Sequence, residues 1–233
     1  MDIRLFAALR DRELRREGIL VAEGRLLAER LLRSGLPVLG VLCAPRFEAS
    51  FLPLSAGACP LRVLPEREIA RIAGFAFHRG VLAVARRPEP PALEALLPTL
   101  PAASLLLACP DLTDPENLGS VIRSSAALGA DAVLLGPRSC DPWSRRALKV
   151  AMGASFSIPV VRCENEGQAC GVLRAGGYTV AGASLSGDAQ PLEHYRRPER
   201  LCLVLGNEAE GLGEPWRSCC DVLFTIPMHR GTD

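Results

Sequence analysis

The stretch DPENLGSVIRSSAALG, residues 114–129, decides how the second half of this chain folds. Pro115 stands just ahead of an apolar stripe with helical spacing, and Asn117 can accept hydrogen bonds from the open backbone N–H groups of a first turn. We therefore predict a helix that begins near Asn117 and ends at the closing glycine. Gly119 and Arg123 share another face, where a sugar or phosphate has room to approach the guanidinium. A surface arginine that is merely solvated would give the same pattern.

Composition excludes several classes of protein. The chain has 233 residues, 48% of them hydrophobic, which is typical of a globular protein with one large domain or two modest ones. A formal net charge of +1 argues against a uniformly basic nucleic-acid binder, so contacts with phosphates would need local arginine clusters. Lys149 is the single lysine, and an arginine-rich basic set favours bidentate contacts with carboxylates or phosphates, although genomic base composition produces the same bias.

The nine cysteines form no CxxC pair and lie near no histidine at metal-ligand spacing. We therefore expect reduced thiols, no metal and a cytoplasmic protein. The N-terminus is too charged for a signal peptide, and no apolar run approaches the length of a membrane span.

The first part of the chain alternates short apolar strands with helices. This pattern predicts a small α/β domain over residues 1–87. The expected helices are 5–16, 25–33 and 66–72, and the expected strands are 19–22, 38–43, 61–64 and 80–85. Five prolines crowd residues 88–101, which we interpret as a semi-rigid linker with at most one helical turn at 92–97.

Residues 102–233 show a more regular alternation. Continuous apolar strands separated by helices predict a parallel sheet covered on both faces. The expected strands are 104–108, 132–135, 158–162, 178–183, 201–205 and 222–226, and the expected helices are 117–128, 142–151, 167–175 and 214–218. Ligands of such sheets bind beyond the carboxyl ends of the strands, which singles out the loops at 111–117, 206–213 and 227–233.

The glycine-rich loop at 206–213 matches neither GxGxxG nor the P-loop, so a dinucleotide or nucleoside triphosphate site is a poor fit. Its carboxylates would repel a phosphate. Gly206 lets the backbone approach a neutral or cationic ligand such as an adenosyl sulfonium, and Glu208 can pair with an arginine. A plain turn with solvated glutamates is the alternative.

Three segments, taken together and in order, are far more specific than any one loop alone. They are NLGSVIR at 117–123, LVLGNEAEGL at 203–212 and IPMHRGTD at 226–233. They resemble the motifs of the SpoU (TrmH-like) RNA 2′-O-methyltransferases of the knotted SPOUT superfamily. Glu23-Gly24 and the segment 78–84 also resemble the family's N-terminal substrate-binding domain, which has a fold like ribosomal protein L30e.

The resemblance implies methyl transfer from S-adenosylmethionine to a ribose 2′-hydroxyl of tRNA or rRNA by a homodimer. By the same resemblance Arg123 is the catalytic arginine, with Asn117 and Glu208 beside it. The implied cofactor contacts are Ala183, Gly206, Ile226 and Met228. The cofactor site lies in a deep trefoil knot in the family. This chain ends at Asp233, inside the third motif, whereas family members continue into a final helix, so on this resemblance we expect an incomplete knot.

The reaction needs a group that receives the proton of the attacking hydroxyl. A guanidinium is effectively always protonated, so two roles remain for Arg123. Either an unusual site deprotonates it in part, or it holds an RNA phosphate that takes the proton while the guanidinium stabilises the developing alkoxide. We prefer the second role. No metal is needed.

Basic residues predict where RNA binds. The candidates are Arg15, Arg16, His78, Arg79 and Arg145. Two other functions stay open: a non-catalytic RNA-binding or assembly protein on the same fold, which the missing final segment favours, and, more remotely, a nucleotide-binding oxidoreductase. Binding of S-adenosylmethionine separates the first from the methyltransferase.

Overall fold

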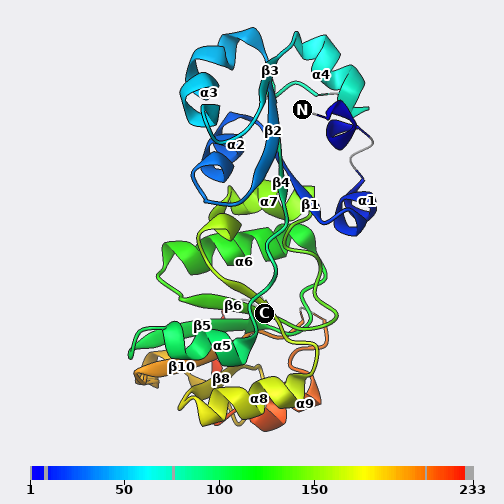
Figure 1. Cartoon of the computed structure of the whole chain (residues 1–233). Helices are drawn as coiled ribbons and strands as arrows, with labels where there is room; N and C mark the ends of the chain where they lie inside the picture. The colour runs from blue at the N-terminus through cyan, green and yellow to red at the C-terminus, as the bar shows by residue number, and fades with distance from the viewer. Residues whose placement is uncertain (1, 8–9, 75–76, 208, 229–233) are drawn as a thin grey trace. The chain divides into compact units, whose positions relative to one another are not determined.

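The computed structural model describes residues 2–7, 10–74, 77–207 and 209–228 (Figure 1). It consists of two units, each considered by itself. The first unit is Met1–Glu89 with Asp141–Ser157, and the second is Pro90–Cys140 with Ile158–Asp233. The sequence placed the segment 141–157 in the second domain, whereas in the structure its helix packs on the first strand of the first unit.

The first unit is built on a four-stranded sheet in the order β1-β4-β2-β3. The strand β4 pairs antiparallel with β1 and β2, and β2 pairs parallel with β3. The elements of this unit are η1 (Ile3–Phe6), α1 (Asp11–Arg16), β1 (Ile19–Glu23), α2 (Arg25–Leu32), β2 (Val38–Cys43), η2 (Pro45–Phe47), α3 (Glu48–Ser55), β3 (Leu61–Val63), α4 (Glu66–Ala73), β4 (Val81–Arg86), α7 (Arg145–Ala151) and η4 (Ala154–Phe156).

Alternation along β1 gives this sheet a core on each face. Leu20 and Ala22 pack with α2, α3 and α7, while Ile19 and Val21 pack with η1, α1 and α4. One prediction here was wrong, and one helix was missed. The helix expected over 5–16 is divided into η1 and α1, with Arg10 extended between them, and α3 was not expected because Pro53 stands inside it.

The second unit holds a seven-stranded parallel sheet in the order β7-β6-β5-β10-β8-β11-β9, as the sequence predicted for its class. Its elements are α5 (Leu93–Leu96), η3 (Leu97–Thr99), β5 (Ser104–Cys109), α6 (Pro115–Ala127), β6 (Ala132–Leu135), β7 (Val160–Arg162), α8 (Glu166–Ala175), β8 (Thr179–Ala183), β9 (Gln190–Pro191), η5 (Leu192–His194), β10 (Arg200–Val204), α9 (Glu214–Cys219) and β11 (Val222–Thr225).

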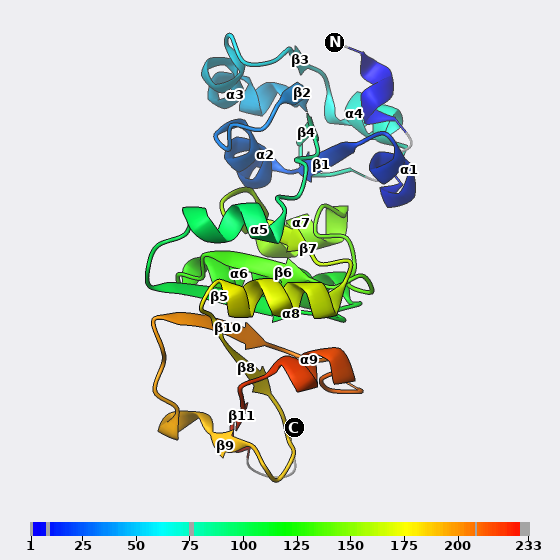
Figure 2. The ribbon, with the colours of Figure 1, turned by 60° about the horizontal axis from the view of Figure 1, so that its bottom comes forward.

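Helices cover both faces of this sheet. The helix α6 lies on one face, and α5, α8 and α9 lie on the other (Figures 1 and 2). The core on the second face joins Leu173 of α8 and Trp216 of α9 to strand residues such as Leu106, Leu134 and Val180. Because the strands are parallel, their carboxyl ends gather at one edge. The expected knot involves residues 229–233, which lie outside the described residues, so it stays a prediction. Within the described ranges, no helix has the length and apolarity needed to span a membrane.

Candidate active site

Three of the four predicted cofactor positions lie at or just beyond the ends of neighbouring strands at the carboxyl edge of the large sheet. In the order β10-β8-β11, Val204 and Leu223 are both paired with Gly182. Ala183, Gly206 and Ile226 therefore come one, two and three residues after the same row of the sheet. The structure thus brings together three points that are far apart in the sequence, and their contact with a cofactor stays a prediction.

Gly206 occupies a position that only glycine fits. A Cβ atom there would overlap the backbone carbonyl of Gly211 and lie 2.5 Å from the backbone nitrogen of Leu212. The loop closes on itself, since Asn207 and Gly211 exchange two backbone hydrogen bonds of 2.9 Å. These two bonds hold Asn207 and Gly211 against each other beside the strand end. Glu208, the predicted motif glutamate, lies outside the described residues.

Asn207 joins two of the loops that the sequence singled out. Its Nδ2 donates to the backbone oxygen of Asp111 at 3.1 Å, while its Oδ1 accepts from the backbone N–H groups of Ala209 at 2.9 Å and Glu210 at 3.2 Å. Sequence reasoning missed this residue. An asparagine directly after a strand-end glycine was the available signal, because asparagine side chains hydrogen-bond the backbone two residues on.

A cavity of about 630 Å³ opens at this edge of the sheet. Its lining includes Gly206, Asn207, Asp111 and Arg138, and the last two form an ion pair of 2.7 Å. Trp216 also lines it, and its indole N–H is buried with no hydrogen-bond partner among the described residues. Of the predicted site residues that the structure describes, Gly206 lines the cavity, whereas Arg123, Asn117, Ala183, Ile226 and Met228 do not.

The charge of this cavity favours a neutral or cationic ligand. Four carboxylate side chains besides the paired Asp111 stand in its wall, against the single cation of Arg138. They are Glu164, Glu166, Glu210 and Glu214. A phosphate would be repelled here, while a positively charged centre would be attracted.

The end of β11 presents apolar side chains to solvent. Ile226 and Met228 are 54% and 59% exposed, and Leu185, which follows β8, is 71% exposed. Leu185 and Ile226 each come two residues after the paired residues Ala183 and Phe224. Exposed apolar side chains at adjacent strand ends offer contact to a flat apolar ligand group such as a purine.

The helix α6 begins earlier than predicted, with a different cap. Asp114, not Asn117, is the N-cap: its Oδ1 accepts from the backbone N–H groups of Glu116 at 2.6 Å and Asn117 at 3.3 Å. Aspartate is as good an N-cap as asparagine, and Pro115 fits the first helical position, so the helix begins at Pro115, two residues before the predicted start. Gly129 is left-handed after the helix end, as predicted.

Arg123 stands exposed on α6, two turns beyond Asn117. Within the described ranges it makes no hydrogen bond or ion pair with another residue. Its guanidinium charge is therefore not neutralised by a described carboxylate. Its place beside a substrate stays a prediction.

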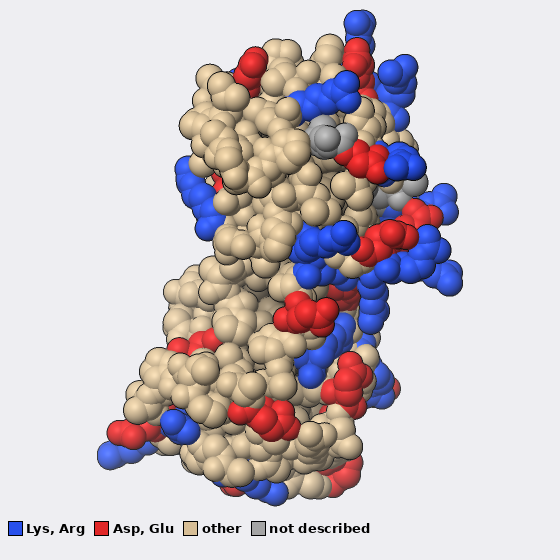
Figure 3. Space-filling view, viewed as in Figure 1, with Lys and Arg blue, Asp and Glu red and all other residues tan. Residues whose placement is uncertain are grey.

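The predicted RNA-binding residues of the first unit differ in their surroundings. Arg15 and Arg16 are exposed on α1, where basic and acidic side chains are interleaved, and Arg16 pairs with Glu17 at 3.2 Å (Figure 3). His78 and Arg79 are exposed just before β4. Arg145 instead forms an ion pair with Glu23, and its backbone N–H donates to Asp11 at 3.0 Å. Its side chain thus holds α7 against β1.

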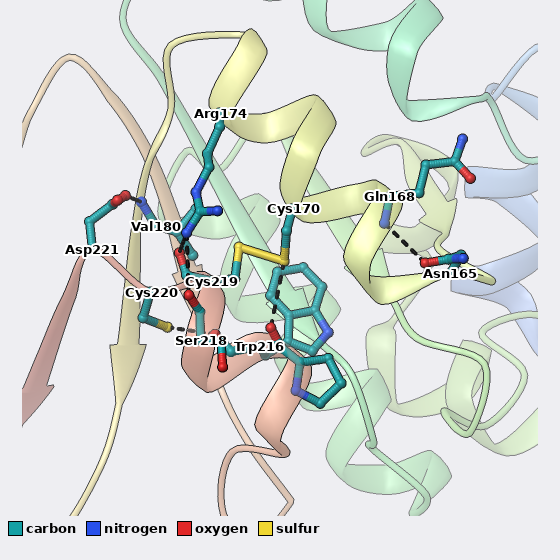
Figure 4. Close-up of a disulfide and its surroundings, with 11 residues drawn as sticks. Asn165, Gln168, Cys170, Arg174, Val180, Trp216, Ser218, Cys219, Cys220 and Asp221 are labelled. Atoms are coloured by element: carbon teal, nitrogen blue, oxygen red, sulfur yellow. Dashed lines mark hydrogen bonds between the residues drawn. A yellow bond between two sulfur atoms is a disulfide. The ribbon is translucent and has the colours of Figure 1, made fainter.

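A disulfide joins α8 to α9 next to this edge, and it corrects the expectation that all cysteines are reduced. Figure 4 shows Cys170 of α8 bonded to Cys219 of α9 beside Trp216. Arg174 adds hydrogen bonds of 3.3 and 3.1 Å to the backbone oxygens of Ser218 and Cys219. The helix that follows the 206–213 loop is therefore fixed to its neighbour. Sequence spacing could not show this pair, because it depends on how two helices face each other.

Other thiols of the second unit are unreactive at neutral pH because of their surroundings. Burial, assisted by the nearby carboxylates of Glu94, Glu164 and Glu166, raises the pKa of Cys163 to about 12. Burial also raises the pKa of Cys220 to about 11. Thiols with such values stay protonated and behave as small apolar groups.

Comparison with known proteins identifies the class. Residues 104–233 match the model of the SpoU rRNA methylase family. The chain is 33% identical over 222 residues to an uncharacterised tRNA/rRNA methyltransferase of Mycobacterium bovis, a match that covers 93% of this chain and 76% of the relative. Over 136 residues it is also 33% identical to the 23S rRNA (guanosine-2′-O-)-methyltransferase RlmB of Neisseria meningitidis, covering 58% of this chain and 54% of the relative.

Solved structures show the same fold. An AdoMet-bound rRNA methyltransferase of Sinorhizobium meliloti superimposes with a TM-score of 0.83 at 23% identity, covering 99% of this chain and 86% of that one. The SpoU methyltransferase AviRb of Streptomyces viridochromogenes, in complex with AdoMet, superimposes with a TM-score of 0.83 at 22% identity. The match covers 99% of this chain and 89% of that one. The protein is thus an RNA methyltransferase by class. It belongs to the SpoU rRNA methylase family.

Proposed function

We propose that this protein transfers the methyl group of S-adenosylmethionine to a ribose 2′-hydroxyl of ribosomal RNA. The observation that carries the proposal is the convergence of Ala183, Gly206 and Ile226 at adjacent strand ends. The family description names rRNA, and the relative from Neisseria meningitidis is named a guanosine-2′-O-methyltransferase of 23S rRNA. Transfer RNA is the alternative substrate, which the experiment below includes.

The cofactor is proposed to lie across the carboxyl ends of β10, β8 and β11. Gly206 supports this placement because its lack of a side chain lets the backbone of Gly211 and Leu212 pack directly against this strand end. Ile226 and Met228 supply exposed apolar surface for the adenine. The acidic wall of the neighbouring cavity attracts the positive charge of a sulfonium and would repel the negative charge of a phosphate.

Arg123 is proposed to act on the substrate side of the reaction. The ribose oxygen attacks the methyl carbon, the carbon–sulfur bond breaks, and S-adenosylhomocysteine leaves. A guanidinium without a described carboxylate partner is suited to hold an RNA phosphate, which takes the hydroxyl proton, and to stabilise the developing negative charge on oxygen. Asn117 and Glu208 are proposed to orient it. Alignment of oxygen, carbon and sulfur supplies much of the acceleration.

This chemistry needs no metal, and the described residues contain no cluster of His, Cys, Asp or Glu that could hold one. A homodimer is proposed as the active form. Light scattering of the purified protein tests it, and a single mass of one chain at working concentration would contradict it.

The experiment is to incubate the protein with S-adenosylmethionine carrying a labelled methyl group and either rRNA or tRNA from cells that lack this gene. The expected product is a 2′-O-methylnucleoside from rRNA, recognised because the adjacent linkage resists alkaline hydrolysis. Label on tRNA alone would move the substrate to tRNA. Label on a base would refute the ribose assignment, and no label despite RNA binding would favour the non-catalytic alternative.

A further inference from the structure

The first unit contains a cavity of about 300 Å³ between the turn from β1 to α2 and the end of α7. We call it the α2–α7 pocket. The residues that matter below are Gly24, Leu26, Arg79, Lys149 and Met152. Its volume is at the lower end of the range for small-molecule pockets, about 300–1,000 Å³. The edge of the large sheet does not contribute to it, because every lining residue belongs to the first unit.

The α2–α7 pocket is rich in positive charge that is not neutralised. Arg79 and Lys149 make no hydrogen bond or ion pair with other residues in the part of the chain that the structure describes. The third cation, Arg25, pairs with Glu29 at 2.7 Å. The pocket's carboxylate, Glu23, is already paired with Arg145. Two cations therefore face the pocket without a counter-charge.

Backbone geometry places Arg79 in the pocket. Gly24 has φ +90°, a conformation that favours glycine, and the Cδ of Arg79 lies 3.4 Å from where a Cβ of Gly24 would stand. The side chain of Arg79 therefore packs over Gly24 at ordinary contact distance. Gly24 also precedes α2 with no side-chain cap, so first-turn N–H groups of α2 add positive potential to the pocket that Gly24 and Arg25 line.

The lining of the pocket also includes apolar residues, and the end of α7 that carries one of them is held in place. Met152 adopts left-handed φ of +54° at the end of α7, and its backbone oxygen accepts a hydrogen bond from Arg30 of α2. The next residue, Gly153, would bring a Cβ within 3.2 Å of Leu27. Leu26, 44% exposed, also lines the pocket. The end of α7 is thus fixed against α2, which carries Leu26.

We propose that the α2–α7 pocket holds one unstacked nucleotide of the RNA, with its phosphate on Arg79 and Lys149 and its base against Leu26 and Met152. The inference rests on the proposed RNA substrate. Single-stranded RNA is recognised through splayed bases on flat or apolar surfaces, and through phosphates that position the chain. A pocket lined by two unneutralised cations and by apolar side chains offers contacts to both parts of a nucleotide.

The experiment measures how the full-length protein binds a fluorescent 12-nucleotide oligouridylate, by anisotropy at several salt concentrations. Lys149→Gln and Arg79→Gln are each expected to weaken binding at least fivefold at low salt. Each should also lower the slope of log affinity against log salt by about 0.7, the value for one lost phosphate contact on a single strand. Leu26→Gln is expected to weaken binding with an unchanged slope, because it removes apolar contact only.

Arg62→Gln is the matched control. Arg62 is exposed on β3, at the opposite edge of the same sheet from β1, so it changes the net charge equally without touching the pocket. Equal loss in Arg62→Gln and Lys149→Gln would overturn the proposal in favour of a general electrostatic attraction. Binding of oligouridylate that is unaffected by both Lys149→Gln and Arg79→Gln would also overturn it.

A 4-thiouridine oligonucleotide gives a second readout. Ultraviolet crosslinking followed by mass spectrometry is expected to mark the peptides that contain Leu26 or Met152, and crosslinks confined to other peptides would contradict the pocket. These results are separate from those on methyl transfer. Normal methyl transfer with no role for the pocket refutes this inference alone, and specific RNA binding without methyl transfer refutes the proposed function alone.

Discussion

The helices α6 and α7 begin in the same way and hold their arginines differently. Each has a side-chain cap, Asp114 in one and Ser144 in the other. Arg123 on α6 is exposed with no described partner, whereas Arg145 on α7 is paired with Glu23 and held at its backbone by Asp11. Both residues are arginines, and both were predicted to be functional, Arg123 in catalysis and Arg145 in RNA binding. The neighbouring carboxylates decide which arginine is available to a substrate and which one fixes a helix.

The largest expected effect is on Arg123. We expect Arg123→Ala to slow methyl transfer at saturating substrate by about 10²–10³-fold, the loss seen when one donor to a developing oxyanion is removed. The free energy of unfolding should change by less than about 0.5 kcal/mol because the side chain is exposed. Single-turnover transfer and urea denaturation measure the two quantities.

Arg197 is exposed between β9 and β10, so Arg197→Ala is the matched control and should keep full activity. Arg123→Lys should recover less than a tenth of the rate, since ammonium cannot make a bidentate contact. A lysine variant with most of the activity would refute the bidentate role of Arg123.

Loss of the disulfide should have the next largest effect, on the free energy of unfolding. Cys170 and Cys219 are 49 residues apart, and closing such a loop stabilises a fold by about 2–4 kcal/mol. We expect Cys170→Ser with Cys219→Ser to lower the free energy of unfolding of the second unit by that amount, and reduction of the wild type to do the same. Urea denaturation with and without reductant measures it. If reductant leaves the wild-type transition unchanged, the pair does not form in solution.

Arg145→Ala should mainly lower stability, whereas Arg123→Ala should mainly lower activity. It leaves Glu23, which is 15% exposed, without its cation, so the free energy of unfolding should fall by about 2 kcal/mol. The figure is reduced from that of a fully buried pair because both side chains retain some solvent contact. The double variant with Glu23→Gln should lose less than the sum of the single variants. Strict additivity in urea denaturation would contradict the pairing.

Raising the pH by one unit above 9.0, the ordinary pKa of a thiol, should produce the smallest effect. The pKa of Cys163 is raised from its ordinary value of 9.0 to about 12, so between these values the unfolded chain loses the proton while the folded chain keeps it. Stability is therefore complete below pH 9 and falls above it, by up to about 1.4 kcal/mol per pH unit. Cys163→Ala should flatten this part of the curve of unfolding free energy against pH. An identical slope in the variant would contradict the assignment.

Local patterns were sufficient to predict the large sheet. The strand at 132–135 was located to the residue, and β5, β8, β10 and β11 to within one residue at each end, because buried parallel strands are continuous apolar runs. The strand β9 was not predicted because it is so short, and the helix α3 was not predicted because it contains a proline. The packing of 141–157 with the first unit depends on Arg145, Glu23 and Asp11, whose meeting no local pattern encodes.

The candidate site was predictable in part for the same reason. Strand ends put Ala183, Gly206 and Ile226 at one edge, since their order along the chain and the parallel class fix that edge. The hydrogen bond from Asn207 to Asp111 and the disulfide between α8 and α9 require distances between segments that are remote in sequence. Those contacts became visible only with the fold.

Titration calorimetry with S-adenosylmethionine tests the central claim most directly. The wild type is expected to bind the cofactor, and Gly206→Ala to lose at least tenfold in affinity, because the added Cβ overlaps the backbone of Gly211. Gly171→Ala, whose Cβ meets nothing within 4 Å on α8, should bind as the wild type does, with circular dichroism confirming that both variants are folded. A wild type that takes up no cofactor, or a folded Gly206→Ala that binds it with full affinity, would contradict the placement at this edge.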